Sequence, residues 1–383
     1  MIKTKFIVVF LLLISFSNSW GNPKVEVPTA ILMDYNSGKI LFEREADQQI
    51  YPASMTKIMT SIIAFELLKQ DKIKLEDEVI VSENAWRLSS AGYSSMFIML
   101  NDKVTIEDLL KGIIIVSGND ACVALAEAIA GTESNFAEMM TEKAQEIGME
   151  NTNFTNSSGI NDPDNYSTVR DIAIMSKYLI KNYPKYYEYF KEKEFTWDRT
   201  GGDPISQGNR NPLLYKNIGA DGIKTGYLAL EKYSLASSVV GEKRRLISVV
   251  SGFKTKQSRS SDSIKLISWG LRNTNTYEVS QKDISNFKFK TWLGTKELVE
   301  VTTNEDVYVT INKKEVKDFK VSIKYNGPIK APIKKGDELG TLIVQENEDK
   351  IYSVPLYANE DVKKVNFFKS LFLSFNYMIW GDV

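Results

Sequence analysis

The hydrophobic pattern changes once along this chain of 383 residues, near residue 276. Before that point, apolar residues recur mainly every three or four positions, which is typical of amphipathic helices, with a few alternating segments between them. After it, short alternating segments are separated by turn residues, which is typical of half-buried strands. The sequence therefore predicts an α+β domain followed by a small all-β domain of about 85 residues.

The first part of the chain is predicted to begin and end with strands and to be mainly helical between them. Residues 30–43 alternate around Asn36-Ser37-Gly38, which indicates a β-hairpin, and apolar residues at helical spacing follow from Ser54. Thr168 and Asp171 have the spacing of a capping box, so a helix is expected to begin there. Further helices are predicted over 105–115, 120–130 and 260–271, and strands over 218–227, 235–240, 246–252, 298–302, 307–311, 320–324, 340–345 and 351–355.

The first 21 residues have the layout of a secretory signal peptide. Lys3 and Lys5 precede an apolar run at 6–16, and small residues follow up to Gly21. An uncleaved membrane anchor is the alternative, but a membrane span needs about 20 apolar residues. We therefore expect this segment to be removed and the rest of the protein to be exported.

The last segment, 366–380, is predicted to be an amphipathic helix. Its polar residues form one narrow stripe at helical spacing, and aromatic and aliphatic side chains lie opposite. It is too short to span a bilayer, and Lys363, Lys364 and Lys369 would suit anionic headgroups. We expect this helix to lie on a membrane surface; a terminal helix docked on its own domain is the alternative.

Composition limits the chemistry that this chain can perform. It contains no histidine, which excludes a Ser-His-Asp triad, a Cys-His dyad and a zinc site with histidine ligands. Its single cysteine, Cys122, can form neither an intramolecular disulfide nor a cysteine-rich metal site. Its 48 basic and 49 acidic residues nearly cancel, which argues against a nucleic-acid partner. A hydrolytic reaction would therefore need lysine, carboxylate or tyrosine as its base.

One short motif supplies a nucleophile and a base without histidine. In Ser54-Met55-Thr56-Lys57, the serine and the lysine are three residues apart, which puts both side chains on one face of a helix. A lysine in a desolvated pocket beside other cations can lose its proton near neutral pH and act as a general base. The motif is weak alone, because the same spacing recurs elsewhere in the chain.

Two further motifs follow in a fixed order, Ser117-Gly118-Asn119 between two predicted helices and Lys224-Thr225-Gly226 on a predicted strand. The ordered set of Ser-x-x-Lys, Ser-x-Asn and Lys-Thr-Gly resembles the signature of serine β-lactamases and penicillin-binding proteins. The flanking residues make the resemblance narrower. Segments 51–57, 117–120, 209–211 and 221–226, together with the trailing β domain and terminal helix, are similar to those of low-molecular-weight penicillin-binding proteins, specifically D-alanyl-D-alanine carboxypeptidases.

This resemblance implies a fold, an organisation and a function. The fold would be a β-lactamase/transpeptidase-like catalytic domain, with helices on both sides of an antiparallel sheet and a helical subdomain. The expected parts are a signal peptide at 1–21, the catalytic domain at 22–275, the all-β domain at 276–361 and an anchor helix at 362–383. The function would be removal of the terminal D-alanine from peptidoglycan stem pentapeptides. Penicillins would be covalent inhibitors, no cofactor or metal is expected, and the protein would attach peripherally to the periplasmic face of a bacterial inner membrane.

The resemblance also assigns roles to individual residues. Ser54 would form the acyl-enzyme and Lys57 would take its proton. Ser117 would relay a proton to the leaving amine, Asn119 would hold the substrate amide, and Lys224 would add positive potential that lowers the pKa of Lys57. The remaining residues would bind the terminal carboxylate or form the oxyanion hole with the Ser54 backbone N–H: Thr225, Gly226, Tyr227, Arg210 and Arg259.

The sequence departs from the family pattern just after the third motif. Leu228 stands where relatives often carry a threonine, and Glu231-Lys232 replaces a small residue and a glycine. These changes leave the predicted nucleophile intact but bear on substrate affinity and deacylation. A D,D-endopeptidase and a catalytically weak penicillin-binding envelope protein are therefore alternatives. A class A β-lactamase is not favoured, because the chain has no Glu-x-x-Leu-Asn segment and carries an additional β domain.

Overall fold

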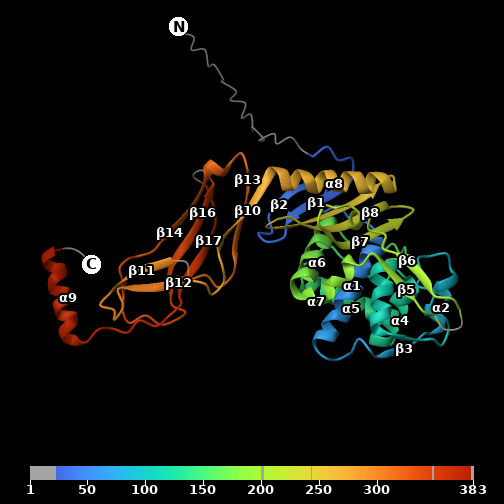
Figure 1. The fold of residues 1–383 in the computed structure, drawn as a ribbon, viewed down its shortest axis with the longest axis horizontal. Helices are drawn as coiled ribbons and strands as arrows, with labels where there is room; N and C mark the ends of the chain where they lie inside the picture. Colours follow the sequence, from blue (N-terminus) through green and yellow to red (C-terminus); the bar gives the residue numbers. More distant parts are fainter. Residues whose placement is uncertain (1–22, 200–201, 243, 286, 347–348, 381–383) are drawn as a thin grey trace, which may run out of the picture.

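A five-stranded antiparallel sheet forms the centre of the N-terminal part of the molecule (Figure 1). The computed structural model describes residues 23–199, 202–242, 244–285, 287–346 and 349–380, so the predicted signal peptide lies outside the described residues. The strand order is β2-β1-β9-β8-β7, which pairs the first strand with one more than 200 residues later. The strands are β1 Thr29–Asp34, β2 Ile40–Arg44, β7 Ala220–Leu228, β8 Lys232–Val240 and β9 Arg245–Phe253.

Both faces of this sheet are covered by helices, because its strands carry apolar residues on both sides. On β1, Ala30 and Leu32 pack with side chains of α8 (Lys256–Asn273), while Ile31 and Met33 point into the cluster formed with α1 (Lys57–Lys69) and α6 (Val169–Asn182). Successive side chains of a strand point to opposite faces, so one strand contributes to both cores. The larger core lies on the side of α1 and α6.

A helical subdomain packs beside the sheet on this side (Figure 1). Thr168 caps α6 as predicted, since its side chain accepts a hydrogen bond from the Asp171 N–H. The other elements of this region are β3 Glu78–Ile80, α2 Glu83–Ser90, β4 Lys103–Thr105, α3 Ile106–Lys111, η2 Gly112–Val116, α4 Asn119–Ala130, α5 Glu133–Glu146, α7 Pro184–Tyr187, η3 Glu188–Lys191, β5 Glu194–Trp197, β6 Ile205–Gly208 and η4 Pro212–Tyr215.

Two helices differ from the prediction, one in where it begins and the other in how it continues. The helix expected from Ser54 begins at Lys57, and Ser54 lies in a preceding 3-10 turn, η1 (Ala53–Thr56), closed by a hydrogen bond from the Met55 N–H to the Pro52 carbonyl. Such tighter turns are common where α-helices begin. The helix expected over 105–115 is α3 followed by the wider π-helical turn η2, which ends at Ser117.

The C-terminal part is a β domain whose six-stranded sheet has the order β14-β16-β17-β12-β11-β15. A separate two-stranded sheet pairs β10 with β13. The alternating pattern found most of these strands, but it missed β10 and β11 and the short β15. The elements are β10 Thr274–Ser280, β11 Phe287–Trp292, β12 Leu298–Thr302, β13 Val307–Asn312, η5 Val316–Asp318, β14 Phe319–Lys324, β15 Ile329–Lys330, β16 Glu338–Glu346 and β17 Asp349–Ala358.

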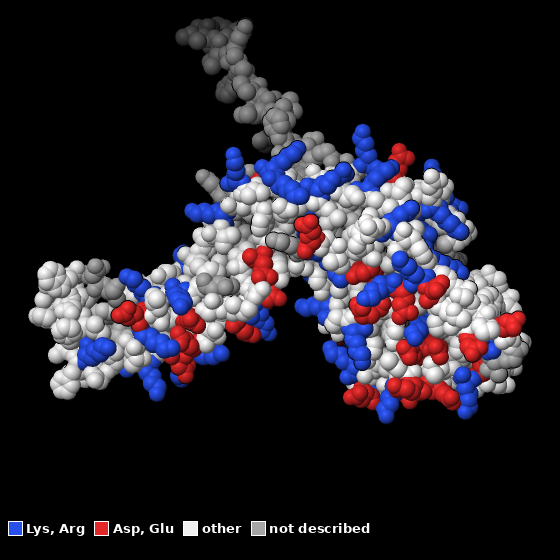
Figure 2. Space-filling view, viewed as in Figure 1, with Lys and Arg blue, Asp and Glu red and all other residues white. Residues whose placement is uncertain are grey.

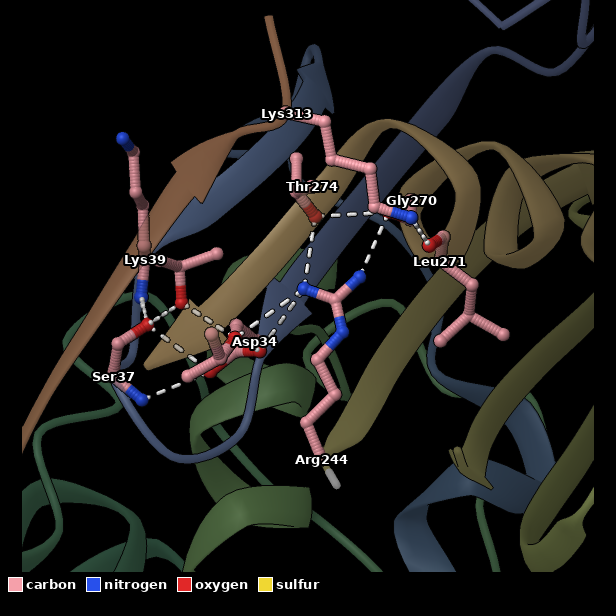
Figure 3. A network of polar contacts seen from close by, with 10 residues as sticks. Asp34, Ser37, Lys39, Arg244, Gly270, Leu271, Thr274 and Lys313 are labelled. Atoms are coloured by element: carbon pink, nitrogen blue, oxygen red, sulfur yellow. Dashed lines mark hydrogen bonds and ion pairs between the residues drawn. The ribbon is translucent and has the colours of Figure 1, made fainter. Parts of the chain in front are cut away.

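A partly buried polar network joins the two parts where α8 runs directly into β10 (Figure 3). Thr276 donates a hydrogen bond to Asp34 Oδ2 at 2.5 Å and contacts the Thr310 hydroxyl at 2.9 Å. The same Thr310 hydroxyl lies 2.6 Å from Ser37 Oγ, in the β1–β2 turn. Arg244 donates to Thr276 and lies 3.7 Å from Asp34. Side chains next to the five-stranded sheet and on the two-stranded sheet therefore meet at one buried carboxylate, that of Asp34.

The last helix, α9 (Phe367–Trp380), lies at the far end of the β domain (Figure 1). Its half-buried side chains include Ser370 and Leu373, and the Tyr377 ring packs 5.1 Å from that of Trp292. The predicted apolar face is solvent-exposed and gives this end of the molecule a mostly uncharged surface in Figure 2. The exposed side chains are Phe367, Phe368, Leu371, Phe372, Phe375, Met378, Ile379 and Trp380.

Candidate active site

The three sequence motifs meet at the edge of the five-stranded sheet. Lys57 Nζ donates hydrogen bonds to Ser54 Oγ at 3.2 Å and to Asn119 Oδ1 at 2.6 Å. Lys224 Nζ, on the edge strand β7, donates to Ser117 Oγ at 2.9 Å. The start of α1, the junction between η2 and α4, and β7 thus each contribute to one cluster.

The second motif owes its shape to the junction between two helices. Ser117 ends the π-helical turn with a left-handed backbone (φ 68°), and Asn119 begins α4. Gly118 between them has little space, because a Cβ there would lie 2.8 Å from an Asp120 carboxylate oxygen. This turn directs the Ser117 hydroxyl to Lys224 and the Asn119 amide to Lys57.

Asp120 is an important residue of this region that the sequence analysis did not assign. Its buried carboxylate accepts hydrogen bonds from the backbone N–H groups of residues 96–98 and from the hydroxyls of Ser89 and Ser95. These bonds hold the loop that carries Ser94. The Ser94 carbonyl accepts the Asn119 N–H, and its hydroxyl accepts a hydrogen bond from Arg210. The sequence feature that could have indicated this role is the position of Asp120 directly after the Ser-Gly-Asn motif.

A second contribution to the site that the sequence did not predict comes from the backbone of Ser158. The carbonyl of this residue accepts a hydrogen bond from Lys57 Nζ at 2.5 Å. The next residue, Gly159, has a φ of +79°, and a Cβ there would lie 1.8 Å from the Ala53 carbonyl oxygen. Only glycine fits so close to the segment that carries Ser54. No hydrophobic periodicity marks such a backbone contact.

Burial determines the electrostatics of both lysines. Lys57 and Lys224 are almost fully buried, and none of the hydrogen bonds described for them is to a carboxylate. Burial lowers the pKa of Lys57, and the nearby Arg210 charge lowers it further, although Asp120 opposes this. The pKa of Lys224 is lowered well below the usual lysine value by burial, then by the charge of Lys57. The charged forms of both lysines are therefore disfavoured, more strongly at Lys224 than at Lys57.

Arg210 and Arg259 lie close together beside β7. Arg259 lies in the first turn of α8, which begins four residues before the predicted helix over 260–271. It is 7 % exposed, stacks over the Tyr233 ring at 5.6 Å and donates to the Arg210 carbonyl, while its Nε finds no hydrogen-bond partner among the described residues. Burial lowers its pKa to about 10. These two guanidinium groups form a cationic region beside Lys224 that is suited to a carboxylate.

The rest of the third motif lies along β7. A Cβ on Gly226 would be 3.1 Å from the Pro52 carbonyl oxygen and 3.3 Å from Ala53 Cβ, so glycine allows this strand to approach the Ser54 segment closely. Thr225 is buried, whereas Tyr227 is 52 % exposed with its ring 4.6 Å from that of Tyr233.

Among the described residues, no group of histidine, cysteine, aspartate and glutamate side chains could hold a metal ion. Cys122 is buried under the site, and burial raises the pKa of its thiol to about 12. The thiol therefore stays protonated and packs as a small apolar group.

Comparisons with known proteins agree with this geometry. Residues 17–255 match the family model of D-alanyl-D-alanine carboxypeptidases, and residues 275–364 match that of the C-terminal domain of penicillin-binding protein 5. The chain belongs to the D-alanyl-D-alanine carboxypeptidase family. Its relatives include the D-alanyl-D-alanine carboxypeptidases DacC of Escherichia coli, 42 % identical over 90 % of this chain and 86 % of the relative, and DacA of Haemophilus influenzae, 38 % identical over 96 % and 95 %.

The fold matches members of this family as well. The crystal structure of penicillin-binding protein 5 from Haemophilus influenzae superposes with a TM-score of 0.80 at 38 % identity, covering 89 % of this chain and 99 % of that structure. The predicted architecture, a penicillin-binding-protein catalytic fold followed by an all-β domain and a final helix, is confirmed. The predicted class, a serine-type hydrolase and low-molecular-weight penicillin-binding protein, is likewise confirmed by the family.

Proposed function

We propose that this protein removes the terminal D-alanine from peptidoglycan stem pentapeptides through an acyl-enzyme on Ser54. The observation that carries the proposal is the pair formed by Ser54 Oγ and Lys57 Nζ, 3.2 Å apart, in which burial lowers the pKa of the lysine. A neutral lysine at hydrogen-bond distance from a serine can take its proton as the hydroxyl attacks.

Acylation follows from this pair. Ser54 Oγ attacks the carbonyl between the two D-alanines, and its proton passes to Lys57 Nζ. The backbone N–H groups of Ser54 and Tyr227 would stabilise the oxyanion, an interaction worth about 3 kcal/mol in comparable sites. The proton then reaches the leaving amine through Ser117, whose hydroxyl is hydrogen-bonded to Lys224. The C–N bond breaks and free D-alanine departs, leaving an ester on Ser54.

Substrate orientation would rely on the cationic region and on Asn119. The terminal carboxylate would bind near Arg210, Arg259 and Thr225, since an arginine fork matches a planar anion. Asn119 already accepts a hydrogen bond from Lys57 through Oδ1, which leaves its amide N–H₂ for the substrate backbone. Deacylation reverses the proton path, with Lys57 taking a proton from the water that attacks the ester.

A fluorescent penicillin tests the proposal. The wild-type protein is expected to be labelled covalently and to release D-alanine from a stem pentapeptide, and Ser54→Ala is expected to do neither. Ser61→Ala, on the same helix but hydrogen-bonded to its own helix backbone, is the matched control and should be labelled normally. Equal labelling of Ser54→Ala would contradict the acyl-enzyme.

The same assay separates the alternatives. Label without D-alanine release would favour the catalytically weak penicillin-binding protein, for which the departures at Leu228 and Glu231 are the supporting observation. Cleavage of cross-linked dimers faster than of pentapeptides would favour the endopeptidase.

We also propose peripheral attachment to the periplasmic face of a bacterial inner membrane. Within the described part of the chain, no helix has the length and hydrophobicity needed to cross a bilayer. The support for surface attachment is α9, whose aromatic and aliphatic side chains are exposed along one face.

A further inference from the structure

We propose that Glu231 is a positioning residue, which holds the β7–β8 hairpin against the segment that leads into Ser54. The inference rests on the proposed acyl-enzyme function and adds a residue to it. Glu231 lies in the turn after Leu228, where the sequence departs from the family pattern, and its side chain is half-buried.

The contacts of this carboxylate connect three separate segments. Its Oε2 accepts a hydrogen bond from the Tyr51 backbone N–H at 3.3 Å, and its Oε1 accepts one from Ser251 Oγ, on β9, at 2.6 Å. Ser251 Oγ also lies 2.7 Å from Ser234 Oγ, on β8, and both serines are fully buried. One side chain in the turn therefore binds the segment three residues before Ser54 and, through serines, the interior of the sheet.

The segment that Glu231 contacts lies along one side of a narrow gap, and β7 lies along the other side. β7 is the edge strand of its sheet, with a neighbouring strand only at β8 among the described residues. Its other side faces Pro52 and Ala53, which lie within 3.3 Å of the Cβ that Gly226 lacks. The two proposed oxyanion donors stand on opposite sides of this gap, at Ser54 and at Tyr227. Their separation depends on how the hairpin and the segment are held together.

The strength of these hydrogen bonds depends on the charge of the carboxylate. Bonds from neutral donors to a carboxylate are roughly twice as strong as bonds between neutral groups. No ion pair within the described residues includes Glu231; burial raises the pKa of its carboxyl, while the hydrogen bonds from Ser251 and Tyr51 oppose this rise by favouring the charged form. Displacing a reacting group by about 1 Å can cost up to 100-fold in rate, so a modest loosening of this gap is expected to be measurable.

The test compares full-length Glu231→Ala and Glu231→Gln with the wild type. The second-order rate of labelling by a fluorescent penicillin is expected to fall about tenfold in the alanine variant and less in the glutamine variant, which keeps one acceptor oxygen. For D-alanine release from a pentapeptide, kcat should fall while KM changes less than about twofold, because Glu231 contacts no substrate. Glu242→Ala, in the exposed turn between β8 and β9, should behave like the wild type.

A double-mutant cycle identifies the path of the effect. Ser251→Ala should give a smaller loss, and adding it to Glu231→Ala should cause no further loss, because both remove the same contact. All rates are compared at a temperature where circular dichroism shows each variant folded, which separates positioning from global stability.

Four outcomes would overturn the inference. Equal labelling of Glu231→Ala and the wild type would show that the contact does not position the site. A higher KM at unchanged kcat would instead indicate that Glu231 binds substrate directly. Slower deacylation with unchanged labelling would indicate that Glu231 acts on the water that attacks the ester. Absence of label on the wild type itself would overturn the proposed function and this inference with it.

Discussion

Lys57 shows how a single residue acquires its chemistry from its surroundings. Its ammonium is removed from water, and its hydrogen-bond acceptors are a hydroxyl, an amide oxygen and a backbone carbonyl, none of which carries a full negative charge. This environment disfavours the charged form and lowers the pKa. The absence of histidine from the chain thus has a counterpart in a lysine whose environment suits the proposed role of base.

Replacing this lysine by arginine tests its role as a base. A guanidinium does not lose its proton, so Lys57→Arg should reduce the rate of penicillin labelling by about 100-fold or more. Lys69→Arg, on the exposed end of α1, is the matched control and should label normally.

The pH profile gives a second readout of the same group. A protonated Lys57 cannot accept the Ser54 proton, so the labelling rate of the wild type should fall as the pH decreases. Because the pKa is lowered, this limb should lie below the ordinary lysine value of 10.5. A limb at or above that value, or normal labelling of Lys57→Arg, would contradict the assignment.

At the scale of elements, α9 has few contacts with the domain that carries it. Its exposed side is a continuous apolar face, and water-exposed aromatic side chains of this number are costly unless another surface covers them. The alternative of a helix docked by its apolar face is not what the structure describes, since half-buried positions such as Ser370 and Asn376 lie on a different side.

Substitutions on the two sides of α9 test membrane attachment. Leu371→Glu with Phe375→Glu should release most of the protein from sedimenting anionic vesicles, because the charges would enter the acyl region. Ser370→Glu with Ser374→Glu adds the same charge near the polar stripe and should reduce binding less. Deletion of residues 366–383 should abolish sedimentation and leave penicillin labelling unchanged; continued sedimentation of the deleted form would contradict the anchor.

At the scale of the whole molecule, the junction in Figure 3 fixes how the β domain stands on the catalytic domain. Thr276 is central to it, since its hydroxyl contacts Asp34, Thr310 and Arg244. Asp34 is fully buried, so the loss of one donor leaves a charged oxygen less satisfied, at a cost of about 1–3 kcal/mol.

Thr276→Val is expected to loosen this junction without affecting the chemistry. The nearly isosteric valine removes the hydroxyl, so distances between spin labels on the two domains should spread over a wider range. Penicillin labelling should stay within about twofold of the wild type, because the catalytic groups lie away from the junction. Thr295→Val, at an exposed position of the β domain, should change neither quantity. Unchanged distance distributions in Thr276→Val would show that other contacts fix the junction.

The sequence alone determined the family, the order of the two folded parts and the residues of the three motifs. These features could be predicted because they are local: a hydrophobic period, a spacing of three residues and a characteristic tripeptide each lie within a short stretch. For the same reason, the N-terminal hairpin, the capped helix at Thr168 and the three long strands of the catalytic sheet agree closely with the pattern.

The tertiary structure decided what surrounds those residues. The Ser158 carbonyl reaches Lys57 across 101 residues of sequence, Lys224 reaches Ser117 across 107, and Glu231 reaches Tyr51 across 180. Contacts of this kind depend on how the whole chain packs, and no local period records them. Burial, which lowers the pKa of both lysines, is likewise a property of the assembled core. The sequence named the candidate reacting groups, and packing gave them the environment that the proposed reaction needs.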